Sequence, residues 1–295
     1  DLSLNISREM LQHDRQLKAI ASRLEKKIKS ELLGMLKTDR ENYETFWKNF
    51  GLQIKYGTYA NFGANRELLE DLLLFTSSRD KKLVSLEEYV SRMSEDQKEI
   101  YYVSGETIDK CDKLPQAEWV KEKGFEILYL VDDVDEFVLS ILHTYKEKTF
   151  KAINQGDLDL SSEEEKEALK SKAEEKKDLL TSLKEALKDQ VVDVRLSSRL
   201  KSHPVCLVAD EGISLEMEKV LAQMPDANNQ VKAKRILELN SDHPLIDALG
   251  KVDSTKVSSY AKLLYNQALL IEGFTIEDPI EFSNSMAQLM IDASK

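Results

Sequence analysis

The sequence predicts a mixed fold: a three-helix connector, a small α/β domain, and an α+β domain that ends in a helical bundle. Three observations support it. From residue 12 to residue 71, apolar residues recur every three or four positions, the period of amphipathic helices. Short apolar runs then alternate with helical patterns up to residue 145, as in α/β domains. After residue 157, a charged helical stretch precedes further strand-like runs and two closing helices.

The connector is predicted to contain three helices. The first carries one apolar stripe made of Leu17, Ile20, Leu24, Ile28, Leu32 and Met35. Asp39 is the expected N-cap of the second, because aspartate favours that position. The second helix continues with the stripe Tyr43, Phe46, Trp47, Phe50 and Ile54. The third is expected over residues 65–71.

The next segment is predicted as a small α/β domain over residues 72–156. Its strands are expected at 72–75, 99–103 and 126–131, because these runs are apolar, β-branched or aromatic. Helices are expected at 86–93, 116–123 and 133–145. Strands that alternate with helices favour a largely parallel sheet. The polar, glycine-containing run at 154–157 is the best domain boundary.

The last segment, residues 157–295, is predicted as an α+β domain. Ser162 followed by three glutamates indicates a helix start, because acidic side chains favour the first turn. The charged stretch up to Lys188 is interpreted as a solvated helix face in preference to an acidic binding tail. Strands are expected at 191–196, 205–208 and 235–239, with a helix at 214–223 before the two closing helices.

Bulk composition excludes several functions. The 295-residue chain has a net charge of −12, which disfavours a general nucleic-acid binder because phosphate contacts need a basic face. No apolar run is long enough to cross a bilayer, so no membrane partner is expected. Cys111 and Cys206 are isolated, which is typical of a reducing compartment such as the cytoplasm. Neither the four histidines nor the cysteines have the spacing of a metal site, and there is no phosphate-binding glycine loop.

Arg8 is the first candidate site residue. It stands on a predicted loop just before a helix, with Gln12 four residues later. An arginine so placed can reach a phosphate held elsewhere, because its charge is permanent and its fork matches phosphate oxygens. An isolated arginine is more often a surface ion pair, and the local pattern favours that interpretation.

The second candidate is the helix from Ile213 to Met224. One side carries the apolar residues Ile213, Met217, Val220, Leu221 and Met224. Methionine adapts to varied apolar partners, so an exposed stripe of this kind suits binding to many proteins. The alternative is that the stripe packs in the core of its own domain, and the pattern alone favours the core.

The third candidate is the pair of closing helices. The residues Val257, Tyr260, Ala261, Leu264, Ala268 and Ile271 line one side of the first helix. The second helix carries the stripe Phe282, Met286, Leu289, Met290 and Ala293. Two terminal helices with this much apolar surface predict either a helical-bundle dimer or packing within the chain.

Five motifs in order along the chain resemble the heat-shock protein 90 chaperone family, bacterial type. They are Ser7–Gln12, Ile100–Glu106, Val194–Leu200, Leu237–Pro244 and Gly273–Pro279. The order of the matches carries more weight than any one of them. Ser241 departs from the family pattern, which usually has proline there; this makes the turn less rigid.

The resemblance implies a division into four parts. Residues 1–14 would end a large middle subdomain, 15–71 would form the connector, 72–156 a small middle subdomain, and 157–295 the C-terminal dimerisation domain. The N-terminal ATPase domain would lie outside this sequence. In the full-length protein Arg8 and Gln12 would contact the γ-phosphate of ATP bound with Mg²⁺ in that domain. We therefore expect no cofactor and no ATPase activity for this chain.

The resemblance also assigns the other candidate residues. Met217, Val220 and Leu221 match a family region that contacts partly folded client proteins, and Phe137 matches a middle-domain aromatic with the same role. The implied function is a homodimeric chaperone fragment that binds unfolded or partly folded clients. A non-catalytic homodimeric scaffold for one defined folded partner is the alternative. The absence of an acidic C-terminal peptide favours a bacterial, cytoplasmic type or an organellar one.

Overall fold

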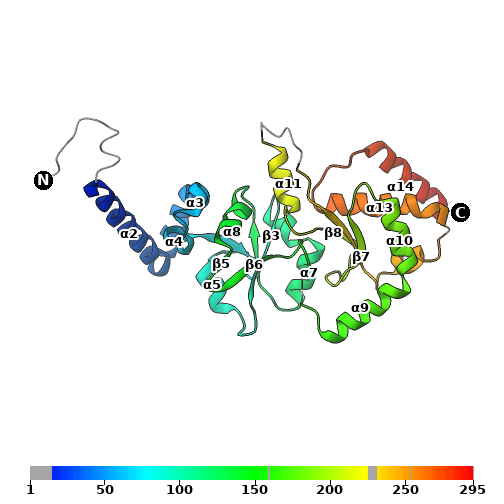
Figure 1. The fold of residues 1–295 in the computed structure, drawn as a ribbon, viewed down its shortest axis with the longest axis horizontal. Helices are drawn as coiled ribbons and strands as arrows, with labels where there is room; N and C mark the ends of the chain where they lie inside the picture. The colour runs from blue at the N-terminus through cyan, green and yellow to red at the C-terminus, as the bar shows by residue number, and fades with distance from the viewer. Residues whose placement is uncertain (1–14, 159, 225–230, 253, 295) are drawn as a thin grey trace. The chain divides into compact units, whose positions relative to one another are not determined.

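The protein is described by a computed structural model covering residues 15–158, 160–224, 231–252 and 254–294 (Figure 1). The chain forms two compact units. The first contains residues up to 76, 82–98 and 134–149; the second contains 77–81, 99–133 and 150 onward. Within the described residues the strands belong to two sheets, one of six strands and one of three. The mixed α/β and α+β class expected from the sequence is confirmed. The four-part division of the chain stays a prediction.

The helical connector is present in the first unit. It comprises α2 (Arg15–Thr38), α3 (Arg40–Gly63) and α4 (Arg66–Leu69), followed by a 3₁₀ turn, η1 (Glu70–Leu72). Asp39 precedes α3 as expected, but its carboxylate accepts from the side chain of Asn42 at 2.7 Å and makes no backbone cap. The phenol of Tyr43 donates to the backbone oxygen of Leu72 at 2.6 Å. This bond fixes α3 against the turn that leads into the first strand.

Strands and helices alternate up to residue 152, and the sheet is mixed, with antiparallel pairs at its two edges. Strands β1 (Leu74–Ser77) and β2 (Leu83–Ser85) pair antiparallel, as do β5 (Thr144–Tyr145) and β6 (Lys148–Ala152). Strands β3 (Glu99–Ser104) and β4 (Ile127–Leu130) pair in parallel. The short strands β2, β5 and β6 were not expected, because runs of two to five partly polar residues give no clear period.

The helices of this part begin and end where local chemistry dictates. Helix α5 (Leu86–Arg92) starts at a capping box between Ser85 and Glu88. Helices α6 (Ile108–Asp112) and α7 (Pro115–Glu122) connect β3 to β4. Helix α8 (Asp135–Leu142) is shorter than the predicted 133–145. It ends because the backbone turns left-handed at His143, where φ is 57°, and then enters the β5–β6 hairpin.

The C-terminal part contains a three-stranded sheet in the order β7-β9-β8. Its strands are β7 (Asp193–Leu196), β8 (Val205–Ala209) and β9 (Arg235–Leu239). Its helices are α9 (Glu163–Glu175), α10 (Lys177–Ala186), α11 (Leu215–Ala222), α12 (Pro244–Leu249), α13 (Ser254–Ile271) and α14 (Pro279–Ala293). Helix α9 buries no residue, which agrees with a solvated charged face.

Helices α10 and α13 cover the sheet and form one hydrophobic cluster with it. Leu183 and Leu187 contribute from the α10 side, Leu207 and Leu237 from the strands, and Ala261 from α13, all fully buried. A second cluster lies between β3, β4 and α7 and includes Val103, Ile127, Ile153 and Leu158. The second unit therefore has an α/β part and a C-terminal part, each with its own apolar core.

Candidate functional site

Helix α11 turns a charged residue inward. Ser214 caps the helix by accepting from the backbone amide of Met217 at 2.9 Å. The buried residues of the helix are Leu215 and Glu218. Glu218 accepts from a guanidinium nitrogen of Arg235 at 2.6 Å and from the backbone amide of Ala233 at 2.9 Å. A buried carboxylate paired in this way fixes which face of the helix meets the domain.

The predicted apolar stripe of this helix is left partly open to solvent. None of its five residues is buried: Ile213, Met217, Val220 and Leu221 are half-buried, and Met224 is 48% exposed. We call these five residues the α11 stripe. The stripe is therefore not buried in the core of its own domain, the alternative that the pattern alone favours.

The remaining predicted contact residues have different settings. Phe137 on α8 is half-buried and packs edge-on against Tyr59, with ring centroids 5.8 Å apart. It belongs to the first unit, whereas α11 belongs to the second. Arg8 and Gln12 lie outside the described residues, so their assignment stays a prediction.

The predicted interface residues divide between buried and open positions. On α13, Val257, Leu264 and Ala268 are buried in the chain's own hydrophobic cluster, while Tyr260 and Ile271 are half-buried. Helix α14 buries no residue. On that helix Phe282 and Leu289 are half-buried, and Met286 and Met290 are 37% and 67% exposed. The apolar surface still open to a partner is therefore mainly on α14.

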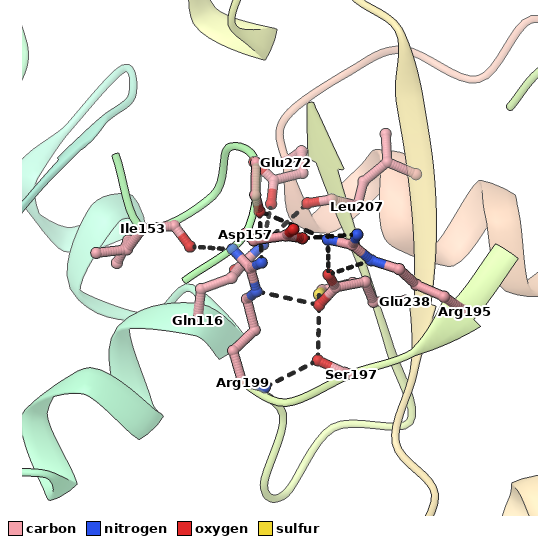
Figure 2. Close-up of polar contacts among 11 residues, drawn as sticks. Gln116, Ile153, Asp157, Arg195, Ser197, Arg199, Leu207, Glu238 and Glu272 are labelled. Atoms are coloured by element: carbon pink, nitrogen blue, oxygen red, sulfur yellow. Dashed lines mark hydrogen bonds and ion pairs between the residues drawn. The ribbon is translucent and has the colours of Figure 1, made fainter. Parts of the chain in front are cut away.

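A buried ionic network was missed by the sequence interpretation (Figure 2). The Glu238 side chain, on β9, is 2% exposed, and the Arg199 side chain is 1% exposed, with Nε of Arg199 3.1 Å from Oε2 of Glu238. Arg195 donates to Oε1 of the same carboxylate from Nε and Nη2, at 3.0 and 2.8 Å. Ser197 donates to Oε2 at 2.7 Å. A charged residue inside the apolar run Ile236–Leu239 was the available signal.

Arg195 remains charged in this network. Burial would lower the pKa of Arg195, but the carboxylates of Glu238 and Asp157 outweigh it and hold the pKa above its ordinary value. Asp157 accepts from Nη1 of Arg195 at 2.8 Å on the solvent side. The network therefore has a buried inner pair, Arg199 with Glu238, and a partly exposed outer pair, Arg195 with Asp157.

The network also holds residues 153–157, which we call the strap. Arg199 donates to the backbone oxygen of Ile153 at 2.9 Å (Figure 2) and to that of Gly156 at 2.6 Å. The Gly156 amide donates to the oxygen of Ala209 at 2.8 Å, and the Ala209 amide donates to the oxygen of Asn154 at 3.1 Å. The strap thus runs beside the end of β8 as a short parallel bridge.

A second polar link lies beside the strap. The side-chain amide of Gln116, on α7, donates to the backbone oxygen of Leu207 and to Oε1 of Glu272, both at 2.9 Å (Figure 2). Lys219 on α11 donates to the backbone oxygen of Glu272 at 3.0 Å. Burial raises the pKa of Glu272 from 4.5 to about 7, with Gln116 and Lys219 opposing the shift.

We expect the raised pKa of Glu272 to make the second unit less stable as pH increases. Between pH 4.5 and about 7 the folded protein holds a proton on Glu272 that the unfolded chain releases, so stability falls over this range. At about 1.4 kcal/mol per pKa unit the total change is about 3 kcal/mol. Urea unfolding between pH 5 and 8 measures it. Glu272→Gln should match the wild type at pH 5 and lack this decline; an unchanged decline would assign it to another group.

Three further observations concern the thiols, metal ions and the membrane. Burial raises the pKa of the Cys111 thiol to about 12 and that of Cys206 well above its ordinary value, so neither is a ready nucleophile. Within the described ranges, no cluster of histidine, cysteine and acidic side chains could hold a metal ion. No helix in the same ranges is long and apolar enough to span a membrane.

Comparison with known proteins gives consistent matches along the chain. A family model described as "Hsp90 protein" matches residues 1–294. The chain is 55% identical over 294 residues to the chaperone protein HtpG of Bacillus subtilis, covering 99% of this chain and 47% of that protein. It is 59% identical over 293 residues to the chaperone protein HtpG of Clostridium acetobutylicum, covering 98% and 46%. The chain therefore spans about half the length of these relatives.

Proposed function

The chain belongs to the Hsp90 protein family, and on that basis we propose that it is the middle and C-terminal portion of an ATP-dependent chaperone that dimerises and binds partly folded proteins. The observation that carries the proposal is the α11 stripe. Its apolar side chains stay partly open to solvent because Glu218 and Arg235 hold the other face of the helix inward. A shallow apolar surface rich in methionine suits segments that unfolded proteins expose.

Catalysis is proposed only for the full-length protein. In that protein ATP and Mg²⁺ would bind in a domain outside this sequence. Arg8, assisted by Gln12, would stabilise the charge on the γ-phosphate of the ATP. This chain by itself would hydrolyse no ATP. Its relatives are bacterial, and Cys111 and Cys206 are both unpaired and buried, which supports a reducing compartment, the bacterial cytoplasm.

We predict that Met217→Glu/Leu221→Glu weakens binding to a labelled, partly unfolded protein by at least about tenfold. The two changes place charges in an apolar contact, which together cost at least about 1.4 kcal/mol. Fluorescence anisotropy measures the affinity. Leu24→Glu/Ile28→Glu on α2 is the matched control, since these residues have the same spacing and are 56% and 57% exposed. Equal binding by both variants would remove the α11 stripe from the proposal.

We predict that Met286→Glu/Met290→Glu converts the dimer into a monomer. These side chains lie on α14, which buries no residue in its own chain, so the change should leave the fold intact. Deleting everything from Val257 onward is a poorer test, because α13 completes the hydrophobic cluster. Light scattering gives the mass, and circular dichroism checks folding. A folded variant that still has the mass of a dimer would exclude α14 as the interface.

A further inference from the structure

The strap is tied to the C-terminal sheet chiefly by hydrogen bonds, while its ends are held by apolar packing on the other side. Ile153, the first residue of the strap, and Leu158, which follows its last residue, are buried in the hydrophobic cluster of the α/β part. Its backbone exchanges bonds with Ala209 at the end of β8, an edge strand of the C-terminal sheet. The side chain of Gln155 donates to the backbone oxygens of Asp210 and Gly212, at 3.2 and 2.9 Å. Separating strap from sheet would therefore break mainly polar contacts.

The side chain of Arg199 binds the backbone of the strap. Its two terminal nitrogens satisfy the oxygens of Ile153 and Gly156, and its charge is balanced by the buried Glu238. Gly156 has φ of 58°, a left-handed conformation that glycine adopts without strain, and its oxygen accepts from the guanidinium. A hydrogen bond to a charged donor is stronger than a neutral one, so these two bonds dominate the attachment.

The outer arginine contributes less to the strap. The Arg195 side chain is 31% exposed and reaches the oxygen of Gly156 only at 3.5 Å. Its partner Asp157 has an 88% exposed side chain, so water competes for that ion pair. The two arginines therefore differ in role although both bind Glu238: Arg199 holds the strap, and Arg195 mainly neutralises the carboxylate.

We propose that Arg199 and Glu238 form a latch that holds the strap on β8 and makes the α/β part and the C-terminal part of the second unit move as one body. Opening the latch is a local event: the strap leaves Ala209 while both hydrophobic clusters stay folded. The segment 154–157, which has the composition of a linker, is in this view a joint whose stiffness is set by one buried ion pair.

Hydrogen exchange at the amides of Gly156 and Ala209 tests the latch, because these two amides bond strap and strand to each other. Arg199→Met should lower their protection by roughly tenfold or more, since it removes two charge-assisted bonds. Protection of Val194 and Leu237 in the β7–β9 ladder should fall by a smaller factor, because Arg195 still pairs with Glu238. Arg195→Met is the matched control and should lower protection at Gly156 by less than about threefold.

The double variant Arg199→Met/Glu238→Gln separates the latch from simple loss of stability. Removing both charges leaves no buried unpaired ion, so the fold is retained. Gly156 and Ala209 should nevertheless exchange as fast as in Arg199→Met. The latch would be refuted by wild-type protection of these amides in either variant, or by an equal loss of protection throughout β7–β9.

Discussion

Glu238→Gln is expected to lower the free energy of unfolding of the second unit by about 3–5 kcal/mol. The change removes the negative charge that pairs with Arg199, whose side chain is 1% exposed, and a buried cation that has lost its counter-charge is very costly. Glutamine keeps the shape and part of the hydrogen bonding of glutamate, so the loss reports the charge and not a cavity.

Urea unfolding followed by tryptophan fluorescence measures this loss. The sequence has two tryptophans: Trp47 lies in the first unit and Trp119 in the second, so Trp47→Phe leaves a reporter for the second unit alone. Asp157→Asn is the matched control, because it removes the exposed carboxylate that also binds Arg195. We expect the control to unfold like the wild type. Equal effects of the two substitutions would contradict the distinction between inner and outer pairs.

Lys55→Met is expected to cost the first unit a similar amount, about 3–5 kcal/mol. The ammonium of Lys55 is 2.6 Å from Asp135, and the two side chains are 5% and 2% exposed. It also lies 5.0 Å from the ring centroid of Phe75 and 5.8 Å from that of Trp47. Methionine fills the same space between the rings but removes the ammonium that pairs with the buried carboxylate of Asp135.

Here Trp47 fluorescence in a Trp119→Phe background is the readout, because Trp47 packs beside Lys55. Lys27→Met provides the control. Lys27 pairs with Glu31 on the open surface of α2, where both side chains are more than 60% exposed. Such a pair contributes little to stability, and we expect no measurable change. If Lys55→Met were equally silent, Lys55 and Asp135 would not stabilise the first unit as a buried pair.

The elements that the sequence predicts well are those with a continuous apolar run or a regular helical period. The strands at 99–103, 126–131 and 235–239 and the helices α7 and α11 lie within a few residues of their expected positions. Elements that depend on backbone conformation were missed. The β5–β6 hairpin turns through Lys146 and Glu147, both with positive φ, and neither residue signals such a turn. Its polar strands also lack an apolar period.

The candidate site was predictable only in part, for a physical reason. Spacing places Met217, Val220 and Leu221 on one side of a helix but does not say whether that side faces the core. The pairing of Glu218 with Arg235 decides which side of the helix faces the core. Spacing cannot reveal this pair, because the two residues are 17 positions apart in sequence. The same limit hid the latch: Arg199 and Glu238 are 39 residues apart, and only the fold brings them together.

The most direct test of client binding measures whether this chain prefers a partly unfolded protein to the same protein folded. One labelled protein is used in two forms: the folded wild type, and a variant that a destabilising substitution keeps partly unfolded. Each form is titrated with the chain and followed by fluorescence anisotropy. Binding at least about tenfold tighter to the partly unfolded form, a difference of 1.4 kcal/mol, is the predicted result. Equal affinity for the two forms, or no binding to either, would contradict the claim that this portion of the chaperone carries a working client surface.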